Sequence, residues 1–195
     1  MDVDARGRES LEVPARVVER GLVARLAVPV AVLGLVGSLS LLGWTWRHPT
    51  LFEADALAYG FEQRPVGQRV YVGMTPAVVS APGPVTLEDI RPVLRTNTAE
   101  AEIAFFVCTL DPTRGIGSVG AVRSLGRACS GVTPVRAGTT FDADASASPR
   151  QQVVMAIEPT APGLVVIDGM KVTYAAGWQH GSQWIGPHVM VETVD

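Results

Sequence analysis

The strongest hydropathy signal in the chain is an apolar stretch near the N-terminus. Residues 26–46 read LAVPVAVLGLVGSLSLLGWTW, twenty-one residues without a charge. As a helix this stretch is about 31 Å long, which matches the hydrocarbon core of a bilayer. Its only polar side chains before the tryptophans are Ser38 and Ser40, so it lacks the polar face of a helix in a soluble domain. The pattern predicts a transmembrane helix.

Beyond this helix the hydropathy pattern changes to short runs with β character, separated by turn sequences. Seven runs are predicted as strands: 69–74, 85–94, 101–110, 151–158, 163–167, 170–174 and 188–194. Asp168-Gly169 stands between two of these runs, and this pair is typical of a two-residue type I′ hairpin turn. Pro92 cannot donate to a sheet ladder, so we expect an edge position or a bulge there.

This pattern predicts an all-β fold for the exported part, a β-sandwich that is immunoglobulin-like in the loose architectural sense. The predicted organisation has four parts. They are a cytoplasmic segment at 1–25, the transmembrane signal-anchor helix at 26–46, a stalk or irregular linker at 47–68 that an irregular first strand would also explain, and the sandwich at 69–195.

The arginines around the helix predict its orientation. Five precede the helix, whereas Arg47 and Arg64 are the basic residues in the first twenty positions beyond it; the five are Arg6, Arg8, Arg16, Arg20 and Arg25. Because basic residues favour the cytoplasmic side, we expect a single-pass protein of the cell membrane with a cytoplasmic N-terminus and an extracellular C-terminal domain. Trp44 and Trp46 suit the far interface.

A cleaved signal peptide is the alternative to a retained anchor. Ser38 and Ser40 form a small-x-small pair that resembles a cleavage site. However, the apolar stretch exceeds the roughly 7 to 15 residues of a signal core and continues through Leu41 and Leu42 beyond such a cut. We therefore favour the anchor.

Small residues follow one face of the predicted helix, and they are Ala27, Ala31, Gly34 and Ser38. Such a face allows another helix to approach closely, so it is a candidate helix-packing surface. The alternative is a lone anchor surrounded by lipid, because small residues are common in membrane helices.

Net charge argues against nucleic acid as a partner. Residues 48–195 hold ten basic and fourteen acidic residues, a net charge of −4. There is no basic stripe of the kind that binds a phosphate backbone.

The two cysteines, Cys108 and Cys129, both fall in the predicted exported domain, where thiols are oxidised in pairs. We predict a disulfide between them. The alternative is that Cys108, in the run FFVCTL, is a buried small hydrophobic residue.

Two partial motifs do not predict a cofactor or metal site. Gly115, Gly117 and Gly120 spell GxGxxG, but no βαβ pattern surrounds them, so we interpret them as a flexible loop. Asp142 and Asp144 resemble the start of a calcium loop, but the glycine and glutamate that such a loop requires are missing. We expect no cofactor and no metal.

Histidine positions give no catalytic signature. His48, His180 and His188 are accompanied by no GxSxG or HExxH motif. We therefore predict no enzyme activity and name no catalytic residue, although a triad built from distant residues would escape a sequence search.

The segment YAAGWQHGSQWIGP, residues 174–187, is the candidate contact surface of the exported domain. It combines two tryptophans with adaptable polar side chains, namely Trp178, Gln179, His180, Gln183 and Trp184. Such a combination is typical of contact surfaces. In the alternative interpretation, one tryptophan fills the core and the glycines shape a hairpin.

Three functions are compatible with this sequence. We favour a non-catalytic binding or assembly module of a bacterial-type envelope, tethered through 26–46 and acting on an envelope or membrane protein or on cell-wall material. The second is a small subunit that docks on a larger membrane complex through its helix. The third is an exported hydrolase without a recognisable motif, which would need a pocket where His180 or His188 meets a carboxylate or hydroxyl.

Overall fold

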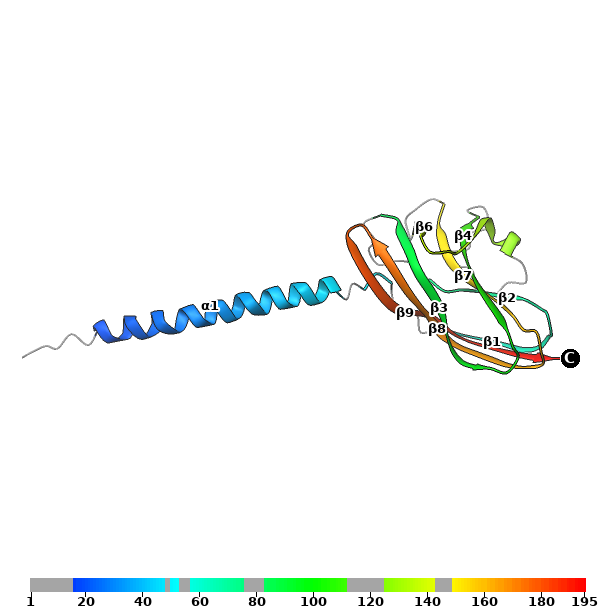
Figure 1. Cartoon of the computed structure of the whole chain (residues 1–195), viewed down its shortest axis with the longest axis horizontal. Coiled ribbons are helices and arrows are strands. Elements are labelled where there is room, and N and C mark those ends of the chain that lie inside the picture. Colours follow the sequence, from blue (N-terminus) through cyan, green and yellow to red (C-terminus); the bar gives the residue numbers. More distant parts are fainter. Residues whose placement is uncertain (1–15, 48–49, 53–56, 76–82, 112–124, 143–148) are drawn as a thin grey trace, which may run out of the picture. The chain divides into compact units, whose positions relative to one another are not determined.

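The structure, a computed structural model, describes residues 16–47, 50–52, 57–75, 83–111, 125–142 and 149–195 (Figure 1). The chain divides into two compact units, Met1–Thr45 and Trp46–Asp195. The described elements are α1 (Arg16–Arg47), β1 (Ala58–Pro65), β2 (Val70–Gly73), β3 (Val85–Asn97), β4 (Glu102–Leu110), the short 3₁₀ helix η2 (Leu125–Arg127), β5 (Cys129–Pro134), β6 (Thr139–Phe141), β7 (Gln151–Glu158), β8 (Gly163–Ala176) and β9 (Gln179–Val194).

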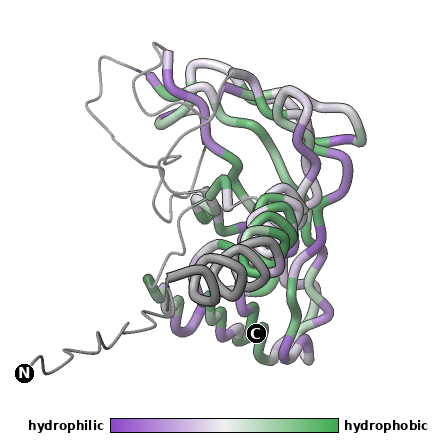
Figure 2. The backbone as a smooth tube through the Cα atoms, turned by 90° about the vertical axis from the view of Figure 1, so that its left-hand side faces the viewer, coloured by the Kyte–Doolittle hydropathy of each residue, from purple (hydrophilic) through white to green (hydrophobic). Residues whose placement is uncertain are grey.

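Helix α1 contains the predicted apolar stretch and is longer than predicted. It begins at Arg16 rather than at residue 26, so part of the segment predicted as a cytoplasmic tail is helical. The hydroxyls of Ser38 and Ser40 donate to the backbone oxygens four residues earlier, each at 2.8 Å, so the helix satisfies its own polar side chains. By length and composition Pro29–Trp46 is suited to cross a membrane, and Figure 2 colours much of it as hydrophobic.

The second unit is a two-sheet, β-sandwich-like fold. One sheet has the strand order β1-β9-β8-β3-β6 and the other β2-β7-β4-β5. Alternate residues of both sheets form a shared core, for example Val72 and Met155 from one sheet and Ile167 and Val172 from the other. The all-β prediction is therefore confirmed at the level of a sandwich of two sheets, and the likeness to immunoglobulins stays a prediction.

The region predicted as a stalk, 47–68, is largely part of the fold where it is described. Leu51 and Phe52 are buried in the shared core. Ala58–Pro65 forms β1, which pairs in parallel with β9 and has a register shift between Phe61 and Arg64. The prediction of a linker is corrected, and the alternative of an irregular first strand holds. Gly60 and Pro65 interrupt this segment, and Phe61 is the one buried residue of β1, so the sequence gives only a weak strand pattern.

Most of the remaining predicted strands are present. The run 151–158 coincides with β7, and the runs 69–74, 85–94 and 101–110 fall within or around β2, β3 and β4. Strands β5 and β6 were not predicted, because they are short and mostly exposed and so lack the alternating pattern. Pro92 adjoins a register shift between β3 and β8, as expected for proline within a strand.

The predicted hairpin turn at Asp168-Gly169 is wrong. Strand β8 runs without interruption through both residues, and the hairpin to β9 turns instead at Gly177 and Trp178. Gly169 does have the positive φ that was predicted, 88°, but it sits at a β-bulge, where Gly169 alone lies opposite Gly186 and Pro187. Turn and bulge share one sequence signal because type I′ turns and G1-type bulges both use a glycine with positive φ.

Cys108 and Cys129 form a disulfide, with a Cα–Cα distance of 5.5 Å. They join β4 to the neighbouring strand β5 and, with Leu125 and Val154, belong to a second, smaller apolar cluster. Val107 and Val153, one position away, face the shared core, so this cluster lies on the outer face of the four-stranded sheet. Closing a loop of this length contributes about 3.4 kcal/mol on the chain-entropy model.

Other parts of the sequence analysis lie outside the described residues. These are the GxGxxG segment and residues 143–148 of the calcium-like loop.

Replacing Gly169 with alanine should destabilise the domain strongly. A Cβ at this position would overlap the backbone oxygen of Ile185, which cannot move without breaking the sheet. Gly138 has a similar φ, 85°, but open space around it, so Gly138→Ala isolates the backbone strain, about 1 to 2 kcal/mol. We expect Gly169→Ala to cost about 4 kcal/mol or more in the free energy of unfolding. Chemical denaturation of the full chain in detergent measures both variants, and equal costs would contradict a close approach at Gly169.

Candidate functional site

The five residues of the predicted contact surface do not form a loop. Trp178 occupies the turn between β8 and β9, and the other four belong to β9 itself. Both tryptophans are exposed, each with 63% of its surface accessible. The expectation that at least one indole is exposed is therefore confirmed, and the alternative of a core tryptophan is wrong.

Strand β9 divides the predicted residues between its two faces. Ile185, Val189 and Val191 are buried in the core. Side chains alternate along a strand, so His180 and Trp184 lie on the opposite, outer face of the five-stranded sheet. Gln183 lies on the inner face.

Gln183 holds the segment that leads into the domain. Its side-chain oxygen accepts hydrogen bonds from the backbone N–H groups of Leu51, at 2.7 Å, and Phe52, at 3.1 Å, and its nitrogen donates to the oxygen of Phe52 at 3.2 Å. The hydroxyl of Tyr174 donates to the same Gln183 oxygen at 2.7 Å. Burial raises the pKa of Tyr174, which keeps the phenol protonated as a donor, although a backbone hydrogen bond with Leu51 opposes that rise. Gln183 therefore serves the fold, and we remove it from the contact surface.

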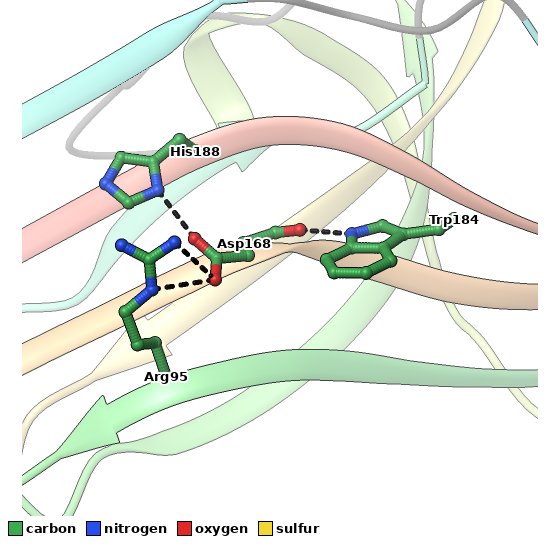
Figure 3. Close-up of polar contacts among 4 residues, drawn as sticks. All are labelled: Arg95, Asp168, Trp184 and His188. Carbon is green, nitrogen blue, oxygen red and sulfur yellow. Dashed lines mark hydrogen bonds and ion pairs between the residues drawn. The ribbon is translucent and has the colours of Figure 1, made fainter.

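The bulge at Gly169 sets the direction of Asp168. Ile167 and Met170 both face the core, although a regular strand without a bulge would place residues three apart on opposite faces. The positive φ of Gly169 allows this reversal of side-chain direction along β8. Asp168 is left pointing outward, between strands β3 and β9 (Figure 3).

Asp168 is the centre of a three-residue polar cluster on the outer face (Figure 3). Arg95 of β3 donates to Oδ2 from both Nε and a terminal nitrogen, each at 2.9 Å. On the other side Nδ1 of His188, from β9, lies 2.8 Å from Oδ1. The Asp168 side chain is 20% exposed, compared with 64% for Arg95 and 40% for His188. The carboxylate thus ties three adjacent strands together.

The side chain of Trp184 is held by the backbone of Asp168. Its indole N–H donates to the main-chain oxygen of Asp168, where the ladder between β8 and β9 shifts register. This acceptor belongs to the neighbouring strand, so the ring must lie down across the sheet. Figure 3 shows the indole beside β8 with the nitrogen directed at this oxygen. The exposed ring is therefore held in one place.

A second histidine pair lies nearer the hairpin. Nδ1 of His180 is 2.9 Å from a carboxylate oxygen of Glu88 on β3, and both side chains are well exposed. Glu88 also lines a hollow of about 200 Å³, which is formed by 87–90 of β3 and 135–137 of the link from β5 to β6. His180 is not part of that lining.

Among the described residues, each of the two histidines pairs with a carboxylate. Both histidines meet a carboxylate, as a hydrolase would need, but no hydroxyl or thiol is seen hydrogen-bonded to either ring among the described residues. No group of three or more His, Cys, Asp or Glu side chains suited to a metal ion occurs among those residues.

Sequence reasoning missed Arg95 and Asp168. Asp168 stands in a recognisable sequence pattern, but its position before glycine indicated a turn. Arg95 has no local pattern, because its contact with Asp168 depends on which strands become neighbours in the sheet.

Gln183→Ala should lower the free energy of unfolding by about 2 kcal/mol or more, because it leaves buried donors of the incoming segment without an acceptor. Gln179→Ala, on the same strand, is the matched control and should change the free energy by no more than about 0.5 kcal/mol. Denaturation of the full chain, followed by intrinsic fluorescence, compares the two. Equal stability of both variants would show that Leu51 and Phe52 are held by other contacts.

Comparison with known proteins assigns no family. No family model matches the chain, and neither curated proteins nor solved structures give a match.

Proposed function

We propose that this protein is a membrane-anchored, non-catalytic binding or assembly module of a bacterial-type envelope, with its sandwich on the outer side of the membrane. The observation that carries the proposal is Trp184, an indole that is 63% exposed and yet fixed by its hydrogen bond to Asp168. Large exposed aromatics on a monomeric domain commonly mark a contact site. A fixed side chain also loses little conformational freedom on binding.

The proposed topology rests on the charge distribution and the disulfide. Arginines cluster on the N-terminal side of the apolar helix, which favours a cytoplasmic N-terminus. A disulfide in the sandwich is typical of an oxidising compartment outside the cytoplasm.

An exported hydrolase is the second candidate, favoured by the pairing of His188 with Asp168 at 2.8 Å. However, the second oxygen of the Asp168 carboxylate accepts a hydrogen bond from Arg95. The cluster also lies on the outer face of a sheet, whereas catalytic groups usually converge in a concave pocket. We therefore place it second.

Protease treatment of intact, right-side-out cells tests the topology. We expect the protease to remove the sandwich and to leave a small fragment that contains the helix. An N-terminal tag should stay protected until the cells are lysed. A mature chain that begins near Leu41 would instead show that the apolar segment is a cleaved signal peptide.

Site-specific photo-crosslinking tests the contact surface. A photoreactive phenylalanine analogue at position 184 of the full chain, in its own membrane, should form an adduct. The matched control is position 132, where the exposed Val132 lies on β5 in the other sheet. In a chain without the photoreactive residue, Trp184→Ala should weaken co-purification of the partner that the adduct identifies. The lost hydrogen bond should lower the free energy of unfolding by about 1 kcal/mol, whereas removal of a core tryptophan would cost about 3 to 5 kcal/mol. Equal adducts at both positions would argue against a specific surface.

A further inference from the structure

The outer face of the five-stranded sheet carries a row of three side chains that crosses three strands. Trp184 of β9 lies directly opposite Lys171 of β8, which lies directly opposite Arg91 of β3. All three side chains are exposed. With strands about 4.8 Å apart, the row is roughly 10 Å long. We call these three residues the Trp184 row.

The indole at one end of the row presents its ring face and not its donor. Its N–H is used by the backbone oxygen of Asp168, so the group available to a ligand is the flat apolar face. Stacking is therefore the contact that this side chain can offer.

Lys171 supplies the charge of the row. It is the only lysine in the chain, and no ion pair joins it to another described residue. Its neighbours differ, because Arg91 pairs with Asp89 at 2.9 Å and Arg95 pairs with Asp168 at 2.9 Å. In a domain with a net charge of −4, an unpaired cation beside a fixed aromatic ring is a local feature suited to an anion.

The surroundings of the ring favour a sugar over a protein. The centre of a protein interface is depleted of charged residues. Trp184 is bordered instead by Lys171, by hydroxyls of Thr173 and Ser182, which lie opposite each other, and by the Asp168 cluster. A pyranose ring has an apolar C–H face for stacking and a polar rim for such neighbours.

We propose that the Trp184 row binds an acidic polysaccharide. A sugar ring stacks on Trp184, its carboxylate pairs with Lys171, and Arg91 contacts the next sugar along the chain. This assignment rests on the proposed binding function and names its ligand class.

Binding of defined acidic oligosaccharides to the full chain in detergent micelles tests this assignment. The probes are a galacturonate hexamer and a hyaluronate hexamer, with maltohexaose as the uncharged comparison, measured by calorimetry. We expect at least one acidic probe to bind at least tenfold more tightly than maltohexaose. Lys171→Gln should remove most of that preference, and added salt should weaken binding of the acidic probe.

Two tryptophan variants separate stacking from folding. Trp184→Ala should weaken binding at least tenfold, and Trp184→Phe, which keeps a ring, should retain most of it. Val132→Ala is the control, because Val132 is exposed but lies on β5 in the other sheet, and it should leave affinity unchanged. Each variant is used only after a thermal unfolding curve shows that it is fully folded at the temperature of the binding measurement.

Failure of both acidic probes to bind would overturn the assignment, as would unchanged affinity in Trp184→Ala. If position 184 crosslinks to a protein while neither probe binds, the binding function stands and the sugar assignment fails. If position 184 gives no specific adduct and neither probe binds, both proposals fail.

Discussion

The close approach of β8 and β9 at Gly169 is the constraint on which the outer face depends. A side chain at this position would overlap the backbone oxygen of Ile185, and one at Gly186 would meet a methyl carbon of Met74 at 2.7 Å. The φ angles of 88° and 92° favour glycine at both positions, and at Gly169 the backbone contact also excludes a side chain. The bulge that results turns Asp168 outward and brings its backbone oxygen to Trp184. The polar cluster and the fixed indole are therefore consequences of one irregularity in the sheet.

Adjacent residues of β9 then perform separate tasks because the side chains of a strand alternate. Gln183 points inward and holds the backbone of Leu51 and Phe52, which completes the core beside Tyr174. Trp184 points outward and stays exposed. A shift of one residue in the register of β9 would exchange these roles, burying an indole in place of an amide. The packing of the core and the exposure of Trp184 thus require the same register.

The sequence predicts features whose signal is local. The apolar helix, strand β7 and the pairing of Cys108 with Cys129 all follow from composition and spacing, and the structure contains them. Asp168-Gly169 was misread because a glycine with positive φ serves a turn and a bulge equally well. The contacts of Asp168 with Arg95 and His188 join residues 73 and 20 positions apart, so they depend on strand order rather than on any nearby pattern.

The two outer faces of the sandwich differ in how far the chain itself covers them. On the four-stranded sheet, the disulfide and Leu125 cover apolar residues such as Val154, so part of that face is closed by the chain itself. On the five-stranded sheet, a carboxylate with a cation on one side and a histidine on the other spans three strands, and an indole lies exposed beside it. Groups fixed on strands keep their geometry better than groups on loops, so they lose less freedom when a ligand binds. The proposed binding site therefore lies on the open face of the five-stranded sheet, where rigidity and exposure coincide, rather than at the hairpin turn.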